Sequence, residues 1–159
     1  MNTHGETLNR FLVEVFNEIL KTEEIALSAI EPELSVREFH LIEEVCRAVD
    51  HGRDNRATAI AAAQRVTAGT LTTAVNLLEK KGYLERRRDE QDRRAVRIYP
   101  TEKGRRADEI HTNFHREMVE DILSILSEEE CQVILRGLSG VTTFFRKKYG
   151  ANHTRGEKK

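Results

Sequence analysis

Residues 58–100 constrain the fold most, because they place two short helical segments and two short strands in a fixed order. The alanine-rich run 58–65 and the run 67–80 predict two compact helices with few residues between them, which is a helix-turn-helix. Gly82 is typical of the residue that ends a helix. The segments "YLERRR" and "AVRIYP" then flank the polar turn "DEQD" and predict a β-hairpin.

The predicted hairpin lies in the most basic part of the chain. Between Glu79 and Arg106 there are eleven Lys and Arg against six Asp and Glu, which leaves 15 against 21 for the rest of a chain whose net charge is −1. Such a concentration creates a local field that attracts polyanions although the whole molecule is nearly neutral. A helix-turn-helix followed by a basic hairpin is the arrangement of a winged helix, which predicts binding to duplex DNA.

The predicted fold is mainly α-helical: a winged helix-turn-helix with a two-stranded β wing, and helices at both ends of the chain. Amphipathic patterns predict long helices before and after the wing, and Ser35 with Glu38 and Ser127 with Glu130 form capping-box motifs at two helix starts. A winged helix alone needs about half this length, so we expect the outer helices to form a homodimer. The expected division is 1–34 and 101–149 for dimerisation, 35–100 for DNA binding and 150–159 as a flexible tail.

The exposed side of the second short helix carries hydroxyl and amide groups that can hydrogen-bond to base edges in the major groove. Lys and Arg of the hairpin can neutralise phosphates, which supplies affinity rather than sequence preference. The candidate DNA-binding residues are Thr67, Thr70, Thr72, Thr73, Asn76, Lys80, Arg87, Arg88, Asp92, Arg93 and Arg94.

Together these motifs resemble the MarR family of winged helix-turn-helix transcription regulators over roughly residues 8–149. The most specific segment is "DEQDRRAVRIYPTEKG", which is similar to the family's wing signature, and "LLEKKGYLER" matches the segment before it. Pro100 departs from the leucine that the family usually has there. The resemblance implies a dimer that binds palindromic DNA, and a pairing of Asp92 with Arg94 that holds the arginine for DNA.

Several further segments, among them "VFNEILKTEEIAL" and "HTNFHREM", look like the branch of the family that represses fatty-acid synthesis genes. In that branch a long-chain acyl group on acyl carrier protein is a corepressor, so acyl carrier protein is an expected partner. The candidate lining of an acyl pocket is Phe11, Phe16, Phe39, Ile42, Ile110 and Phe114, which are equally ordinary core residues.

A zinc-responsive regulator is an alternative. His111 and His115 are four residues apart on one helix face, and His40 with a nearby glutamate can approach them, which is metal-ligand spacing. Zinc-sensing members of the family place ligands in similar regions. The candidate ligands are Glu24, His40, His111 and His115, with Glu23 and Glu38 as other carboxylates; otherwise these histidines pack and hydrogen-bond, and no cofactor is required.

The remaining features exclude other classes of function. The chain has no run of 18 apolar residues and no secretory signal, so we expect a cytoplasmic protein without a membrane partner. The two cysteines, Cys46 and Cys131, lie far apart and indicate reduced thiols, with redox sensing as a lesser alternative. No motif of an enzyme active site is present. The last alternative is an adaptor that binds acyl carrier protein through the basic hairpin without binding DNA.

Overall fold

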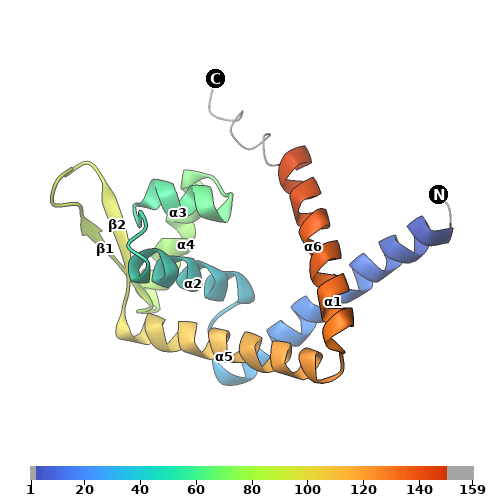
Figure 1. Ribbon diagram of the computed structural model, residues 1–159. Coiled ribbons are helices and arrows are strands. Elements are labelled where there is room, and N and C mark those ends of the chain that lie inside the picture. The colour runs from blue at the N-terminus through green and yellow to red at the C-terminus, as the bar shows by residue number, and fades with distance from the viewer. Residues whose placement is uncertain (1–2, 150–159) are drawn as a thin grey trace. The chain divides into compact units, whose positions relative to one another are not determined.

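The structure is a computed structural model in which residues 3–149 are described. In this part of the chain six helices and a two-stranded sheet follow one another (Figure 1). Their bounds are α1 Thr3–Ile30, α2 Val36–Asp50, α3 Ala57–Gln64, α4 Ala68–Lys80, β1 Leu84–Arg88, β2 Val96–Pro100, α5 Glu102–Ser124 and α6 Glu128–Tyr149. The prediction of a mainly α-helical winged helix-turn-helix is therefore confirmed.

Two of the helices begin at the predicted capping boxes. The Ser35 hydroxyl accepts from the backbone N–H of Glu38, and the Glu38 carboxylate accepts from the N–H of Ser35 at 2.8 Å, which starts α2. Ser127 and Glu130 make the same pair of bonds at the start of α6. Each box satisfies backbone donors that a helix end leaves unpaired.

The buried core lies between α2, α3, α4 and the hairpin, which are neighbours in Figure 1. Its fully buried side chains include Phe39, Ile42, Val45, Ile60, Val75, Leu78, Tyr83 and Ile98. Together with buried Leu84 of β1, these residues come from every element of the helix-turn-helix and the wing, so the core holds α4 and the hairpin in one fixed relation.

The hairpin is antiparallel, with Leu84 opposite Pro100 and Arg88 opposite Val96. Pro100 lacks a backbone N–H, and it stands at the last pair of the ladder, where no further bond is needed. The opposite edge of β2 continues onto the segment before α3, where the N–H of Ile98 donates to the carbonyl of Asn55 at 3.0 Å. The outer edge of β2 thus attaches the wing to the segment before α3.

Gly104 fixes the start of α5 against the base of the wing. A Cβ atom at this position would lie 2.2 Å from the carbonyl oxygen of Tyr83, which is closer than any side chain can approach a backbone atom. Thr101 caps the same helix end by accepting from the N–H of Gly104 at 3.1 Å. Only glycine therefore allows α5 to leave the wing at this point.

The chain divides into two compact units, with the boundary inside α5 between Phe114 and His115. The first unit holds α1 to β2 and the first part of α5; the second holds the remainder of α5 and α6. The division into dimerisation and DNA-binding segments stays a prediction, and the predicted tail, residues 150–159, lies outside the described residues.

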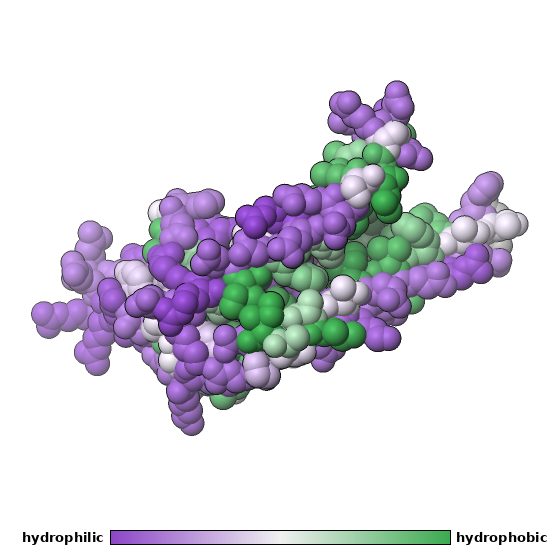
Figure 2. Space-filling model, turned by 90° about the horizontal axis from the view of Figure 1, so that it is seen from below, coloured by the Kyte–Doolittle hydropathy of each residue, from purple (hydrophilic) through white to green (hydrophobic). Residues whose placement is uncertain are grey.

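Two helices expose apolar side chains that this single chain does not cover. On α1 they are Leu8, Phe11, Val13, Val15, Phe16, Ile19, Leu20, Ile25 and Ile30, and on α6 they are Val133, Ile134, Leu135, Leu138, Phe144, Phe145 and Tyr149. No residue of α6 is buried. Figure 2 shows green apolar surface lying open beside purple charged residues. No helix within residues 3–149 has the length and apolar character that crossing a membrane requires.

Candidate nucleic-acid interface

Helix α4 presents a polar face from a well-anchored position. Thr67 caps it, its hydroxyl accepting from the N–H of Thr70 at 3.2 Å. Leu71, Val75 and Leu78 point into the core. The predicted DNA-binding side chains of this helix all lie exposed: Thr70, Thr72, Thr73, Asn76 and Lys80. The sequence therefore places one polar face of α4 outward.

Some of these hydroxyl groups are already used within the helix. The hydroxyl of Thr70 lies 2.9 Å from that of Thr67, and the hydroxyl of Thr73 donates to the carbonyl of Gly69 at 3.1 Å. Such local bonds use these hydroxyl groups within the helix itself. Thr72, by contrast, gives its carbonyl to Arg86, a residue of β1 that the sequence analysis did not select.

The turn of the wing is organised around Asp89, which is 7% exposed. Its Oδ1 accepts from the backbone N–H groups of Gln91 at 2.8 Å and Asp92 at 3.0 Å, and its Oδ2 accepts from the guanidinium of Arg97. These bonds to the charged form hold the pKa of the Asp89 carboxyl below its ordinary value. The carboxylate thus closes the turn while it fixes a side chain of β2.

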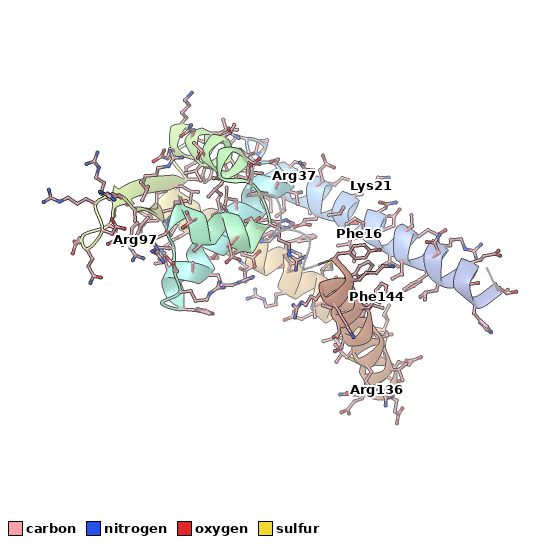
Figure 3. The ribbon with its side chains drawn as sticks, turned by 90° about the horizontal axis from the view of Figure 1, so that it is seen from above. Phe16, Lys21, Arg37, Arg97, Arg136 and Phe144 are labelled. Carbon is pink, nitrogen blue, oxygen red and sulfur yellow. The ribbon has the colours of Figure 1, made fainter. Side chains whose placement is uncertain are left out.

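Arg97 connects the wing to the segment between α2 and α3. Its Nη1 donates to the Oδ1 of Asn55 at 2.7 Å, and the Nδ2 of Asn55 donates to the carbonyl of Ile98 at 2.9 Å. Asn55 is 4% exposed. Figure 3 labels Arg97 beside the hairpin, where it stands opposite Arg87, one pair from the end of the ladder that leads into the turn. We call Asn55, Asp89 and Arg97 the wing lock.

The expected pairing of Asp92 with the guanidinium of Arg94 is corrected by the structure. In residues 3–149 the Oδ1 of Asp92 accepts from the backbone N–H of Arg94 at 3.0 Å, and the carboxylate that pairs with a guanidinium at the wing turn is that of Asp89, which meets Arg97. The reason is local: a short Asp side chain readily bonds the backbone two residues ahead and so stabilises a turn. Arg93 and Arg94 therefore extend from the turn as exposed cations.

The other predicted wing arginines differ in how much of their charge is offset. Arg87 pairs with Glu85, and its guanidinium lies 4.7 Å from the centre of the Tyr99 ring. Arg88 is exposed at the end of β1. Both positions agree with contacts to a phosphate backbone, and Arg88 brings the less neutralised charge.

A buried cluster joins α1, α2 and α5. The Oε1 of Glu23 lies 3.1 Å from the Nε2 of His40 and 2.8 Å from the Nε2 of His111. Glu23 is 2% exposed and His111 is 1% exposed. Burial opposes the charged form of Glu23, but the bonds and charges of His111 and His40 outweigh it, so its pKa is lowered.

The cluster corrects the choice of carboxylate. Glu24, the carboxylate predicted as a ligand, is exposed, whereas Glu23 lies in the cluster. Glu23 precedes buried Leu27 by four residues, so the two share one helix face, while Glu24 is turned by about 100° toward solvent. That spacing could have identified Glu23. His115 follows His111 by one turn of α5, beyond the boundary of the first unit.

The six residues selected for an acyl pocket lie in different environments. Phe39 and Ile42 are fully buried in the core, and Ile110 and Phe114 pack against that core. Phe11 and Phe16 are more than half exposed on α1. The single chain therefore does not bring these six side chains into one cavity, and the acyl pocket stays a prediction.

Neither cysteine is part of this interface. Burial raises the pKa of the Cys46 thiol to about 12, with the nearby Asp108 carboxylate acting in the same direction. A thiol that stays protonated is a poor nucleophile, so Cys46 is a small buried side chain. Cys131 is partly exposed near the start of α6.

Comparisons with known proteins agree with this geometry. The sequence profile of the MarR family matches residues 47–96. The chain is similar to Streptococcus pneumoniae FabT, whose crystal structure in complex with DNA superposes on it with a TM-score of 0.84. The two sequences are 38% identical, and the match covers 89% of this chain and 97% of the FabT chain. The chain belongs to the MarR family. Members of this family are transcription regulators and not enzymes, as the sequence analysis expected.

Two other relatives of this MarR-family chain differ in extent. An uncharacterized HTH-type transcriptional regulator, YwhA of Bacillus subtilis, is 38% identical over 64 residues, which are 40% of this chain and 46% of that protein. The chain thus matches about half the length of this curated relative. The S. aureus MepR–DNA complex covers 87% of this chain and 97% of its own with a TM-score of 0.72; at 22% identity it shows the fold alone.

Proposed function

We propose that this MarR-family regulator binds palindromic duplex DNA as a homodimer and represses fatty-acid synthesis genes, with long-chain acyl carrier protein as its corepressor. The observation that carries the DNA-binding part is the joint position of α4 and the wing. A capped helix with an exposed face of threonine and asparagine and a hairpin with exposed arginines are held by one core. Such an arrangement suits base edges and phosphates of the same duplex.

The exposed apolar faces support the homodimer. A helix without any buried residue, such as α6, gains little from hydrophobic burial in a monomer, and its aromatic side chains Phe144 and Phe145 remain half exposed. Burial of apolar surface is the main driving force of association. A two-fold dimer presents its two α4 helices about 34 Å apart, one turn of DNA.

The acyl corepressor rests on resemblance to the fatty-acid branch and on the similarity to FabT, a protein crystallised with DNA. An acyl group between the dimerisation helices changes DNA affinity only if it binds one spacing of the two lobes better than another. Because Phe11 and Phe16 are exposed on α1 in the single chain, they are available to line a pocket that a second copy completes.

The experiment measures affinity for a palindromic duplex at fixed salt. Purified protein is titrated onto the duplex, onto a half-site and onto a scrambled duplex, each with and without long-chain acyl carrier protein. The proposal is supported if the protein binds the palindrome more tightly than the other two duplexes and if acyl carrier protein increases that affinity. Equal binding to all three duplexes contradicts it, and an unchanged affinity with acyl carrier removes the corepressor.

The same titration separates the repressor from an adaptor that docks acyl carrier protein on the basic wing. In the repressor the DNA surface and the acyl site are separate, so duplex and acylated carrier bind together. An adaptor uses the wing arginines for its acidic partner, and the two then exclude each other.

A second candidate function, a response to zinc, is favoured by the cluster of Glu23, His40 and His111. Their ligand atoms lie within 4.8 Å of one another. In a tetrahedral zinc site with bonds of about 2.0 Å, neighbouring ligand atoms are about 3.3 Å apart. The separations of 2.8 Å and 3.1 Å around Glu23 need only a small expansion to fit, and imidazole with carboxylate is a donor set that zinc prefers.

The zinc candidate has a matched control in the neighbouring residue. Calorimetric titration with zinc compares the wild type, Glu23→Gln and Glu24→Gln. Tight binding that Glu23→Gln abolishes and Glu24→Gln retains supports the site. No binding, or equal binding by all three proteins, contradicts it; DNA affinity measured with zinc alone and with acyl carrier alone then tells which of the two ligands acts.

A further inference from the structure

Arg86 connects β1 to three positions along α4. Its Nη1 donates to the Oδ1 of Asn76 at 2.6 Å and also contacts the carboxylate of Glu79, while its Nη2 donates to the carbonyl of Thr72 at 3.1 Å. Its backbone N–H donates to the other oxygen of Glu79 at 2.9 Å. Its side chain is 26% exposed. Arg86 is therefore neutralised and held in place, unlike the exposed arginines of the wing turn.

This contact fixes which way the Asn76 amide faces. A guanidinium has hydrogen-bond donors and no acceptor, so the Asn76 atom that meets Arg86 is the carbonyl oxygen. Within residues 3–149 this is the one side-chain hydrogen bond of Asn76, which is exposed on α4. What the residue retains for a ligand is the Nδ2 group with its two N–H donors.

An asparagine held in this way is turned away from the usual recognition of adenine, because Arg86 takes one of the two lone pairs of Oδ1 and holds this oxygen toward β1. The bidentate contact to adenine needs the amide oxygen to accept from N6 while the amide nitrogen donates to N7. The two N–H donors of Nδ2 instead fit the neighbouring acceptors O6 and N7 of guanine or the acceptor O4 of thymine, whereas adenine offers N7 alone beside an N6 amino group that is itself a donor. It finds no partner on the N4 amino group of cytosine.

Resting on the proposed binding of duplex DNA, we infer that Arg86 is a positioning residue that sets the base preference of α4. By occupying the Oδ1 of Asn76 it makes this side chain a donor that selects guanine or thymine at the base it faces. Glu79 holds Arg86 in that position and offsets its charge, so that Arg86 acts through Asn76 rather than on a phosphate.

The test selects sequences from a duplex library with a randomised palindromic site, at one fixed salt concentration, using the full-length protein. The wild type, Asn76→Ala, Arg86→Ala and Arg88→Ala are compared. The base pair that Asn76 faces is identified as the one whose preference Asn76→Ala removes. We expect guanine or thymine there in the wild type, by roughly 5- to 150-fold over the worst base.

Arg86→Ala frees the amide oxygen of Asn76. The preference at the base pair that Asn76 faces should then change to adenine, while the other positions keep their preferences. Arg88→Ala, an exposed arginine of the same strand, should weaken binding without changing any preference. Asn76→Asp keeps a partner for Arg86 and offers an acceptor, so the same base pair should change to cytosine. Asn76→Asp remains informative if circular dichroism shows that Arg86→Ala is unfolded.

Three results overturn the inference while leaving DNA binding in place: adenine at that position in the wild type, an unchanged preference in both Arg86→Ala and Asn76→Asp, or no position that depends on Asn76. If the wild type enriches no sequence at all, the proposed function itself fails, and the inference fails with it.

Discussion

Arg97 of β2 donates a hydrogen bond of 2.7 Å from Nη1 to the Oδ1 of Asn55, which stands 42 positions earlier in the chain. The same guanidinium holds Asp89, whose Oδ1 accepts two backbone N–H groups of the wing turn. The orientation of the wing is therefore determined by side chains as well as by its strand ladder. A wing held in this way loses little conformational entropy when it meets DNA.

Asn55→Ala should loosen the wing. The change leaves the carbonyl of Ile98 and part of the Arg97 guanidinium without their partner, which costs about 1–3 kcal/mol of unfolding free energy for buried polar groups. DNA affinity should fall on every sequence alike, because Asn55 reads no base. Urea unfolding and fluorescence anisotropy measure the two effects. Arg106→Ala, which removes an exposed arginine paired within its own helix, is the control and should change neither.

The wing lock should also depend on pH. The pKa of Asp89 is lowered in the folded protein, by the N–H groups of Asp92 and Gln91 and by Arg97. The stabilisation that the ionised Asp89 gives the folded state is therefore complete at pH values above its ordinary pKa of 3.8. It is lost as the pH falls through the lower pKa that Asp89 has in the folded protein. The stability difference between wild type and Asp89→Asn should be constant from pH 7 to about 5 and shrink below about 4. A difference that grows on acidification contradicts the assignment.

The elements of this fold were predictable because their signals are local. Ser35 and Ser127 carry capping boxes, Gly82 has a positive φ of 81° after α4, and the two strands flank a polar turn, so each boundary depends on a few neighbouring residues. The basic exposed turn followed from charge alone.

The contacts that organise the site could not be predicted in the same way, because their partners are far apart in sequence. Arg97 and Asn55 meet only after β2 has paired with the segment before α3, and Arg86 meets Asn76 across the turn at Gly82. The Asp92–Arg94 pairing failed because the backbone competed for the same carboxylate. Only Glu23 carried a usable signal, its spacing of four residues from buried Leu27.

Glu23→Gln should destabilise the metal-free protein, since Glu23 is nearly fully buried and meets both His40 and His111. Glutamine keeps one acceptor oxygen but removes the charge that strengthens both hydrogen bonds, which costs about 1–3 kcal/mol. Thermal unfolding in a chelating buffer measures the effect, and exposed Glu24→Gln is the matched control that should stay within about 0.5 kcal/mol of the wild type. Equal stability of the two variants means that the cluster adds nothing to the fold without metal.

Phe145→Asp should abolish the dimer by placing a charge in the apolar face of α6, where Phe145 is half exposed. Gln132→Asp adds the same charge on the opposite side of this helix, given about 100° per residue, and should leave the dimer intact. Light scattering should give one protomer mass of 18.3 kDa for Phe145→Asp and twice that for the control and the wild type. If the wild type is monomeric at micromolar concentration, the two-fold dimer is contradicted, and with it the expected recognition of a palindrome.

Simultaneous contact of α4 and the wing with one duplex is tested most directly by the salt dependence of binding. Affinity for the selected palindrome is measured for the wild type and for Arg94→Ala at salt concentrations between about 50 and 200 mM, a range over which the slope can be determined. Removing one phosphate contact from each protomer should flatten the slope of log K against log salt by about 2 and weaken binding to all sequences. An identical slope for both proteins would show that Arg94 at the tip of the wing does not touch the DNA that α4 reads, which contradicts simultaneous contact.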